Sequence, residues 1–235
     1  MPNSIQYIVA YYAITSLGAV VTGVNPTYKP LEILHQFKTT ETKYLVVLDA
    51  LYVRDYKEIK DKWDLKKVIY TNIGDLLSGI VRFVAKRIKK VEVFGDFPVD
   101  HPNAVSFKEC LDVDPNVPKV EINTSEDPAT LIMTGGTTGV PKAAVLTHQN
   151  VVSNAVQCKE ILLNQKPEGE TNELGPKTGM IGVLPLYHSF AMTTVMNITP
   201  TVGGWMMLYP KPPDTEELLN DLEKLPNDNG FIYCA

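Results

Sequence analysis

A segment of nine residues between two apolar runs carries the residue types that bind polyphosphates. It contains three glycines, three threonines and one lysine, in the order Thr134, Gly135, Gly136, Thr137, Thr138, Gly139, Val140, Pro141 and Lys142. Glycines let backbone N–H groups turn towards one point and let an anion approach closely. Threonine hydroxyls add donors, and a lysine supplies a compact positive charge for a phosphate. The segment therefore predicts a loop that holds the phosphates of a nucleotide.

The spacing within this loop excludes two common phosphate-binding motifs. A Walker A loop needs its lysine directly after the last glycine, but Val140 and Pro141 separate Gly139 from Lys142. The glycines do not follow the G-x-G-x-x-G order of a dinucleotide-binding turn either. The loop instead resembles the Ser/Thr-Gly-Thr-Thr-Gly-x-Pro-Lys-Gly signature of the adenylate-forming superfamily, with Ala143 where the family usually has glycine. That superfamily includes acyl-CoA synthetases, peptide-synthetase adenylation domains and firefly luciferase.

A second motif follows the apolar run at residues 179–184 and ends in Pro185-Leu-Tyr-His188. It resembles the Leu-Pro-x-(aromatic)-His signature of the same superfamily. The resemblance implies that His188 lies at the acyl pocket, near the point where a carboxylate meets the α-phosphate. The carboxyl end of a strand is where α/β sheets place their ligands. A buried histidine with satisfied hydrogen bonds is the alternative, and a tryptophan gate found in some relatives is replaced here by Met192.

The resemblance implies an α/β fold, with mostly parallel β-sheets flanked by helices. It identifies residues 1–235 as a single incomplete large amino-terminal AMP-binding domain, most similar to that of long-chain fatty-acid–CoA ligases. The small carboxyl-terminal lid domain, with its catalytic lysine, and the Tyr-Gly-x-Thr-Glu segment match no residues of this chain. We therefore expect residues 1–235 to have little or no activity alone.

The implied reaction joins a carboxylic acid, most simply a fatty acid, to a thiol at the expense of ATP. The implied cofactors are ATP, Mg²⁺ and coenzyme A. The implied catalytic residues are Lys142 and His188, and Thr134 is the implied Mg²⁺ contact. The implied nucleotide contacts are Thr134, Gly135, Gly136, Thr137, Thr138, Gly139, Lys142, Tyr187 and His188. Two alternatives stay open: an aryl-CoA ligase or adenylation module, and a non-catalytic fragment that binds nucleotide or a protein partner.

Composition narrows the function classes further. The net charge of -5 argues against general nucleic-acid binding. The sequence has three cysteines, which are far apart in the chain, and this favours free thiols in a reducing, cytoplasmic setting. Residues 5–24 carry no charge, but we interpret them as a helix, a stop at Gly18 and a strand, with a membrane span as the minority alternative.

Residues 75–91 mix apolar and basic side chains. This pattern is typical of a helix that packs on its own domain with a solvated basic end, which is our preferred interpretation. The alternative is a peripheral contact with an acidic membrane, which would suit an enzyme that takes fatty acids. A homo-oligomer is a further hypothesis, because an incomplete sheet exposes unpaired strand edges.

The remaining elements alternate between strand and helix. Strands are predicted at 19–24, 44–48, 67–70, 105–107, 129–133, 143–146, 179–184, 203–209 and 231–235. Helices are predicted with Asn3, Thr147 and Asp214 as their N-caps, with Pro30 in the first turn of another, and at about 51–61. In the first helix, Ile5, Ile8, Val9 and Tyr12 sit at helical spacing. The predicted buried faces of three later helices are Leu31, Leu34 and Phe37; Val151, Val152, Ala155, Val156, Leu162 and Leu163; and Leu218, Leu219, Leu222 and Leu225. His148 opens one helix, where simple exposure is preferred over a phosphate contact.

Overall fold

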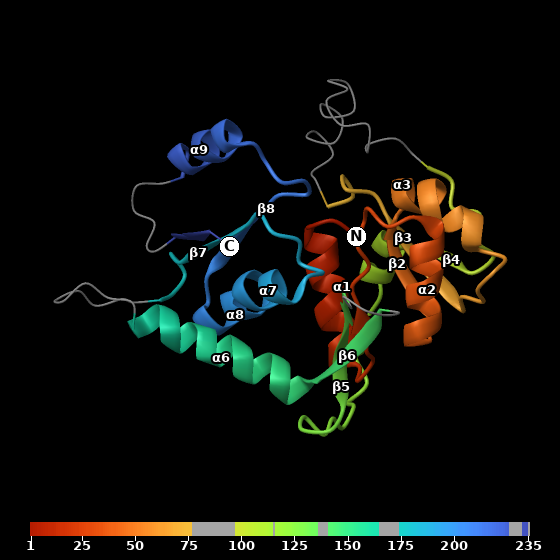
Figure 1. Ribbon diagram of the computed structural model, residues 1–235, viewed down its shortest axis with the longest axis horizontal. Coiled ribbons are helices and arrows are strands. Elements are labelled where there is room, and N and C mark those ends of the chain that lie inside the picture. The colour runs from red at the N-terminus through yellow and green to blue at the C-terminus, as the bar shows by residue number, and fades with distance from the viewer. Residues whose placement is uncertain (77–96, 115, 136–140, 165–173, 226–231, 235) are drawn as a thin grey trace. The chain divides into compact units, whose positions relative to one another are not determined.

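The computed structural model describes residues 1–76, 97–114, 116–135, 141–164, 174–225 and 232–234 (Figure 1). These residues form two compact units. The first unit comprises Val24–Lys119 and Met133–Ala143, together with Met1. The second comprises Pro2–Gly23, Val120–Ile132 and Ala144–Ala235. The single domain expected over 1–235 stays a prediction.

The first unit contains a three-stranded sheet in the order β2-β3-β4. All its strands run parallel, with Tyr44 opposite Lys67 and Val68 opposite Ala104. The strands are β2 (Tyr44–Leu48), β3 (Lys67–Thr71) and β4 (Ala104–Ser106). The helical elements are α2 (Pro30–Thr40), α3 (Asp49–Leu51), the π-helical η1 (Tyr52–Tyr56), the 3₁₀ turn η2 (Lys57–Ile59) and α5 (Phe107–Leu111). This alternation confirms the predicted parallel α/β arrangement.

The core of the first unit lies between this sheet and its helices. Ile33 and Phe37 of α2 pack with Val47 and Val68 of the sheet, and all four side chains are almost fully buried. The predicted face of α2 was wrong at Leu31, which is 72% exposed. Ile33 takes its place because it lies four residues before Phe37, on the same side of the helix.

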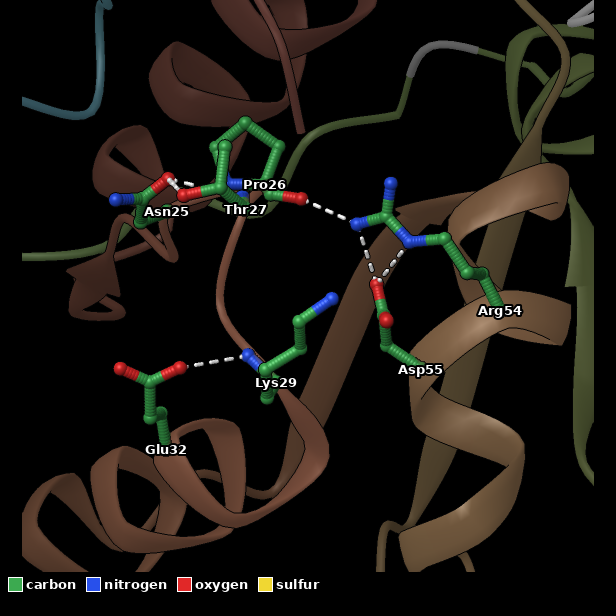
Figure 2. Close-up of polar contacts among 7 residues, drawn as sticks. All are labelled: Asn25, Pro26, Thr27, Lys29, Glu32, Arg54 and Asp55. Carbon is green, nitrogen blue, oxygen red and sulfur yellow. Dashed lines mark hydrogen bonds and ion pairs between the residues drawn. The ribbon is translucent and has the colours of Figure 1, made fainter.

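Polar contacts hold the start of α2 and the neighbouring helix η1 in the first unit (Figure 2). The Glu32 carboxylate accepts the backbone N–H of Lys29 at 2.8 Å, which satisfies a donor that the helix itself leaves unpaired. Arg54 donates to the carbonyl of Pro26 and forms an ion pair with Asp55 at 2.6 Å. Because Asp55 is buried, this pairing compensates a charge that would otherwise be costly.

A polar network lies at the carboxyl ends of β2 and β3. Asn72 donates through Nδ2 to Asp49 at 3.1 Å, and its backbone N–H donates to Asp75 at 2.8 Å. Burial raises the pKa of Asp49, while hydrogen bonds from Asn72 and Ala50 act in the opposite direction. Asn72 is therefore hydrogen-bonded to both carboxylates, which holds the ends of the two strands together. Within the described ranges, no group of three or more His, Cys, Asp or Glu side chains could hold a metal.

The second unit contains two three-stranded sheets, in the orders β1-β5-β6 and β8-β7-β9. β1 runs parallel to β5, and β7 runs parallel to both β8 and β9. The strands are β1 (Val21–Thr22), β5 (Pro128–Thr134), β6 (Lys142–Thr147), β7 (Gly179–Gly182), β8 (Trp205–Leu208) and β9 (Ile232–Cys234). The far tips of β5 and β6, at Thr134 and Lys142, group with the first unit.

The helices of the second unit include a continuous helical segment over residues 189–202 that we did not predict. It consists of α7 (Ser189–Ala191), the π-helical η4 (Met192–Asn197) and α8 (Ile198–Val202). The other helices are α1 (Ile5–Ser16), α6 (His148–Asn164) and α9 (Thr215–Glu223). Figure 1 shows α6 running alongside this segment, and α6 contacts both η4 and α8.

Two predicted helix caps are confirmed, and one was wrong. The Thr147 hydroxyl accepts the backbone N–H of Asn150 at 3.2 Å, and the Asp214 carboxylate accepts that of Glu217 at 2.8 Å. The first helix is capped by Ser4, not by Asn3, because the Ser4 hydroxyl accepts the Tyr7 N–H at 3.2 Å. Asn3 is buried and makes other hydrogen bonds.

The predicted apolar faces of the helices in the second unit were only partly correct. On α6, Ala155 is buried, but Val152 and Val156 are 59% and 45% exposed. On α9 no residue is buried, and Leu219 is 55% exposed. On α1 the buried positions are Gln6, Tyr7, Tyr11 and Thr15, while Ile5 is 58% exposed. The aromatic rings of Tyr7 and Tyr11 fill the core more fully than the aliphatic face does.

The uncharged amino-terminal stretch folds as the twelve-residue α1 followed by Gly18 with a positive φ of 68°. None of the described helices is both long and apolar enough to span a membrane. The predicted basic helix at 75–91 falls almost wholly outside the described residues, so the membrane-contact hypothesis stays a prediction.

Replacing Glu41 by glycine is expected to stabilise the first unit. Glu41 ends α2 in the left-handed region, with φ 50° and ψ 41°, where a side chain is strained and glycine is not. We expect Glu41→Gly to raise the free energy of unfolding by about 0.5–1 kcal/mol, measured from urea denaturation.

The same chemical change at Glu58 is the matched control for this prediction. Glu58 is exposed and lies in the 3₁₀ turn η2 of the same unit. Glycine there adds only unfolded-state entropy, so Glu58→Gly should lower stability by about 0.5–1 kcal/mol. Equal effects of the two substitutions would contradict the assigned backbone strain at Glu41.

Candidate functional site

The described ends of the phosphate-loop segment meet at its base. Thr134 is the last residue of β5 and Lys142 is the first residue of β6. The Thr134 hydroxyl donates to the backbone carbonyl of Lys142 at 3.0 Å. Both residues are exposed, so the Lys142 ammonium can meet a ligand from solvent. Gly136, Thr137, Thr138 and Gly139 lie outside the described residues, and their roles stay predictions.

Gly135 follows Thr134 without any neighbour that would require a glycine. A Cβ atom added at Gly135 would meet no heavy atom within 4 Å. The surrounding described protein therefore leaves room for a side chain at this position. A glycine here agrees with a loop whose backbone must be approached by a ligand, because packing does not explain it.

The histidine motif lies in a tight turn directly after β7. The His188 N–H donates to the Pro185 carbonyl at 3.0 Å, and His188 is the N-cap of α7. Its Nδ1 accepts the backbone N–H of Phe190 at 3.3 Å. In the neutral imidazole, an accepting Nδ1 leaves the proton on Nε2, which is then a donor. His188 is exposed, so the alternative of a buried, satisfied histidine is wrong.

One buried side chain holds the backbone that leads to His188. Asn3 is 4% exposed. Its Nδ2 donates to the carbonyls of Gly182 at 3.1 Å and Leu184 at 2.9 Å, and its Oδ1 accepts the N–H of Leu186 at 2.8 Å. The Gly182 carbonyl also accepts the Tyr209 N–H at 3.3 Å, but Leu184 and Leu186 lie beyond the end of β7 and have no strand neighbour. The amide of Asn3 takes the place of that neighbour and fixes the turn.

Tyr187 packs against β1 at a position where only glycine fits. A Cβ atom at Gly23 would lie 2.8 Å from Cβ of Tyr187, 3.0 Å from its Cα and 2.9 Å from the hydroxyl of Tyr7. The backbone of the histidine motif therefore approaches the chain after β1 closely. Burial raises the pKa of Tyr7, and the nearby phenols of Tyr11 and Tyr187 add to this effect. Tyr7 is consequently a neutral packing residue at any ordinary pH.

Met192, four residues after His188, is part of the core. It is 3% exposed, and the Tyr11 hydroxyl contacts its sulfur at 3.8 Å. His148 differs from the expectation of simple exposure. It is half-buried, and its Nε2 is out of contact with solvent.

The structure thus brings together Thr134 with Lys142, and Tyr187 with His188. The two pairs belong to different compact units, and their relative position stays a prediction. Sequence reasoning missed Asn3 and Gly23 as residues that position the histidine motif. The sequence showed only a glycine at the end of a predicted strand and an asparagine ahead of a helix. Neither signal indicates which residue the glycine or the asparagine contacts.

Comparison with known proteins decides the family. A sequence model described as AMP-binding enzyme matches residues 1–226. The chain belongs to the AMP-binding enzyme family. It is 34% identical over 232 residues to a long-chain-fatty-acid–CoA ligase of Salmonella typhimurium, covering 96% of this chain and 39% of that protein. It is also 29% identical over 215 residues to 4-coumarate–CoA ligase 2 of Oryza sativa, covering 90% of this chain and 34% of that protein.

The fold of this AMP-binding chain is likewise that of a solved family member. The crystal structure of a long-chain-fatty-acid–CoA ligase from Archaeoglobus fulgidus matches with a TM-score of 0.68 and 25% identity, covering 95% of this chain and 36% of that one. The expected fold class is therefore confirmed. The chain spans about two fifths of the length of its curated relative.

Removing the Asn3 amide is expected to loosen the histidine turn. Asn3→Ala removes the partner of the buried Leu186 N–H and of the Leu184 carbonyl, and it removes one of the two donors to the Gly182 carbonyl. We expect a loss of about 2–4 kcal/mol in the free energy of unfolding. Asn116→Ala, at an exposed asparagine, is the control and should change stability by less than about 0.5 kcal/mol. Hydrogen exchange at Leu186 measures the turn directly, and unchanged protection in Asn3→Ala would refute the role of Asn3.

Two glycine substitutions separate packing from ligand access. Gly23→Ala forces Tyr187 to shift, and we expect it to cost about 1–3 kcal/mol of stability. Gly135→Ala meets no neighbour and should stay within about 0.5 kcal/mol of the parent chain. Thermal unfolding measured side by side tests both. A stability loss in Gly135→Ala as large as that in Gly23→Ala would show that the loop glycine is a packing residue after all.

Proposed function

We propose that this chain carries the phosphate loop and the histidine motif of an ATP-dependent acid–thiol ligase. The observation that carries the proposal is the loop from Thr134 to Lys142, closed at its base by the Thr134 hydroxyl. Lys142 is exposed, and the described neighbours of Gly135 leave room for a side chain there. Both features suit a loop that binds phosphate better than a purely structural turn. Membership of the AMP-binding family and the similarity to named CoA ligases support it.

In the proposed reaction, the ATP phosphates lie over residues 134–142. An oxygen of the substrate carboxylate attacks the α-phosphorus, and the bond from that phosphorus to the bridging oxygen of pyrophosphate breaks. The products are an acyl-adenylate and pyrophosphate. A thiol, proposed to be that of coenzyme A, then takes the acyl group and releases AMP. The first step depends mainly on positioning and on charge neutralisation, which is the proposed role of Lys142.

His188 is proposed to act at the carboxylate. Its Nδ1 is occupied by the Phe190 N–H, so its Nε2–H is the group left to donate. A donor held in this orientation steadies the negative charge that shifts during attack on the α-phosphorus. Tyr187, packed against Gly23, keeps the turn in place and is proposed to line the same site.

The residues present are compatible with a Mg²⁺ ion that enters with the nucleotide. Mg²⁺ usually takes few protein ligands and is held together with phosphate oxygens and water. The Thr134 hydroxyl donates its proton to a backbone carbonyl, which leaves its oxygen lone pairs free for a cation. When bound, such an ion would neutralise phosphate charge next to Lys142. Thr134 is therefore the proposed protein contact for Mg²⁺.

The proposed substrate class is a fatty acid. The Salmonella typhimurium relative described above is named for long-chain fatty acids, and it is identical to this chain at more positions than the 4-coumarate ligase is. The similarity to the coumarate enzyme keeps an aryl carboxylic acid as the second candidate within the family. A panel of fatty and aryl acids in an adenylation assay would distinguish them.

A different function class is nucleotide binding with little turnover by residues 1–235 alone. The family resemblance assigns an adenine-binding segment and a catalytic lysine to motifs that match none of these residues. Losing one well-placed group of this kind costs about 10²–10³ in rate. An ATP–pyrophosphate exchange assay on residues 1–235 tests this class, and exchange at ordinary enzyme rates would contradict it.

Replacing Lys142 by alanine is expected to weaken ATP binding by about 10–100-fold, because a charge-assisted hydrogen bond contributes about 1.5–3 kcal/mol. Isothermal titration of ATP measures the effect. Lys67→Ala is the matched control, since Lys67 is also an exposed first residue of a strand. Equal ATP affinity in Lys142→Ala and Lys67→Ala would overturn the assignment of the loop.

A further inference from the structure

A cavity of about 290 Å³ lies within the second unit and has no role in the proposed adenylation. Its walls come from α1, β5, α6 and the helical segment at 189–202. Tyr11, Tyr12, Ala129 and Ala155 are among the residues that make it mostly apolar. We call it the α1–α6 cavity. None of Thr134, Lys142, Tyr187 and His188 is among its lining residues.

A buried amide in the wall of this cavity has an unused donor. Asn197 is 7% exposed and lines the cavity. Its Oδ1 accepts the hydroxyl of Tyr12 at 3.0 Å, and the amide lies close enough to the Tyr11 phenol to affect its pKa. Its Nδ2 nevertheless meets no acceptor with hydrogen-bond distance and angle among the residues that the structure describes. The Tyr12 hydroxyl has one proton and also faces the Met196 carbonyl at 2.8 Å. Turning the amide over would therefore pair Nδ2 with Tyr12 and leave Oδ1 unpaired instead.

A second unpaired polar atom lines the same cavity from another element. His148 is the first residue of α6, and its backbone N–H donates to the Asp127 carbonyl at 3.3 Å. Its Nε2 is buried and has no partner in the described part of the chain. The seventeen-residue α6 adds the partial positive charge of a helix amino terminus at this point. Nδ2 of Asn197 is a donor, and Nε2 of His148 is a donor in the tautomer that carries its proton there, so this pair of atoms favours an acceptor between these walls.

The combination of walls and polar atoms is typical of a small-molecule site. Such sites are mostly apolar and carry a few polar groups that orient the ligand. The volume is near the lower end of their range of about 300–1,000 Å³, which limits the ligand to roughly one ring or a short chain. Burying unpaired donors costs stability unless a ligand or water meets them.

We propose that the α1–α6 cavity binds a small apolar carboxylate. Its carboxylate oxygens accept from Asn197 Nδ2 and from the protonated ring nitrogen of His148. Its hydrocarbon part packs between Tyr11, Ala129 and Ala155. A carboxylate is preferred to a neutral carbonyl because the helix amino terminus favours negative charge.

The test uses residues 1–235 with labelled alanine and valine methyl groups and three probes of one ring each. Benzoate offers a charged acceptor, benzamide a neutral one, and benzylamine a cation with donors only. We expect benzoate to shift the methyl signals of Ala155 and Val151 in a saturable way. Benzylamine should bind at least about tenfold more weakly, because its ammonium group can only donate and the cavity wall also presents donors. Absence of benzoate shifts up to its solubility limit, or equal binding of all three probes, would overturn the proposal.

Variants then assign the contacts. Asn197→Leu keeps the size of the side chain but removes the donor, and should weaken benzoate binding about tenfold. Gln149→Ala, an exposed neighbour of His148 on α6, is the control and should leave it unchanged. Ala155→Leu fills the cavity while keeping both polar groups, so it should abolish benzoate binding. This variant keeps the site testable if Asn197→Leu does not fold. Unchanged affinity in a folded Asn197→Leu, or in a folded Ala155→Leu, would refute the assigned site.

Discussion

The histidine motif depends on one buried amide that lies about 180 residues away in the chain, as the hydrogen bonds of Asn3 show. A chain that runs past the end of a strand must find new partners for its backbone groups or expose them to solvent. Asn3 offers one acceptor and two donor hydrogens, which is the complement of one N–H and two carbonyls. No other side chain except glutamine has this set, and glutamine is one methylene longer. The start of α1 is consequently tied to the end of β7.

Close packing around β7 explains several glycines that carry no chemistry. A Cβ atom at Gly179 would lie 2.3 Å from the Trp205 ring, and one at Gly204 would lie 2.4 Å from the Thr178 carbonyl oxygen. Gly23 belongs to the same class, because Tyr187 occupies its side-chain space. Gly135 belongs to another class, since nothing described occupies its space. The sequence alone cannot distinguish a glycine required by packing from a glycine that leaves room for a ligand, because the residue is the same in both cases.

The sequence predicted the strands well and the buried faces of helices poorly. The run Tyr44–Leu48 was predicted with its observed bounds, since a short β-branched run bounded by polar residues has few other interpretations. The helical segment at 189–202 was missed because its own side chains are buried on several sides. It therefore lacks the single apolar stripe, opposite a polar face, that marks a surface helix. The faces of α6 and α9 failed because periodicity locates an apolar stripe without saying whether a neighbour covers it.

The candidate site divides in the same way. Residue types and order were enough to predict the loop from Thr134 to Lys142 and the motif at His188, because chemistry of this kind needs particular groups in sequence. The supporting residues Asn3 and Gly23 were not predictable, since their partners are set by tertiary packing.

The same limit explains why Asn197 carried no signal in the sequence. It ends the π-helical turn η4, and such a turn holds an extra residue that shifts the direction of the side chains after it. Its phase relative to His188 therefore cannot be counted at 3.6 residues per turn. Only the folded helix places this amide beside Tyr12 and in the wall shared with His148. An amide that has one partner in the protein and one free end is held in place by the first and available through the second.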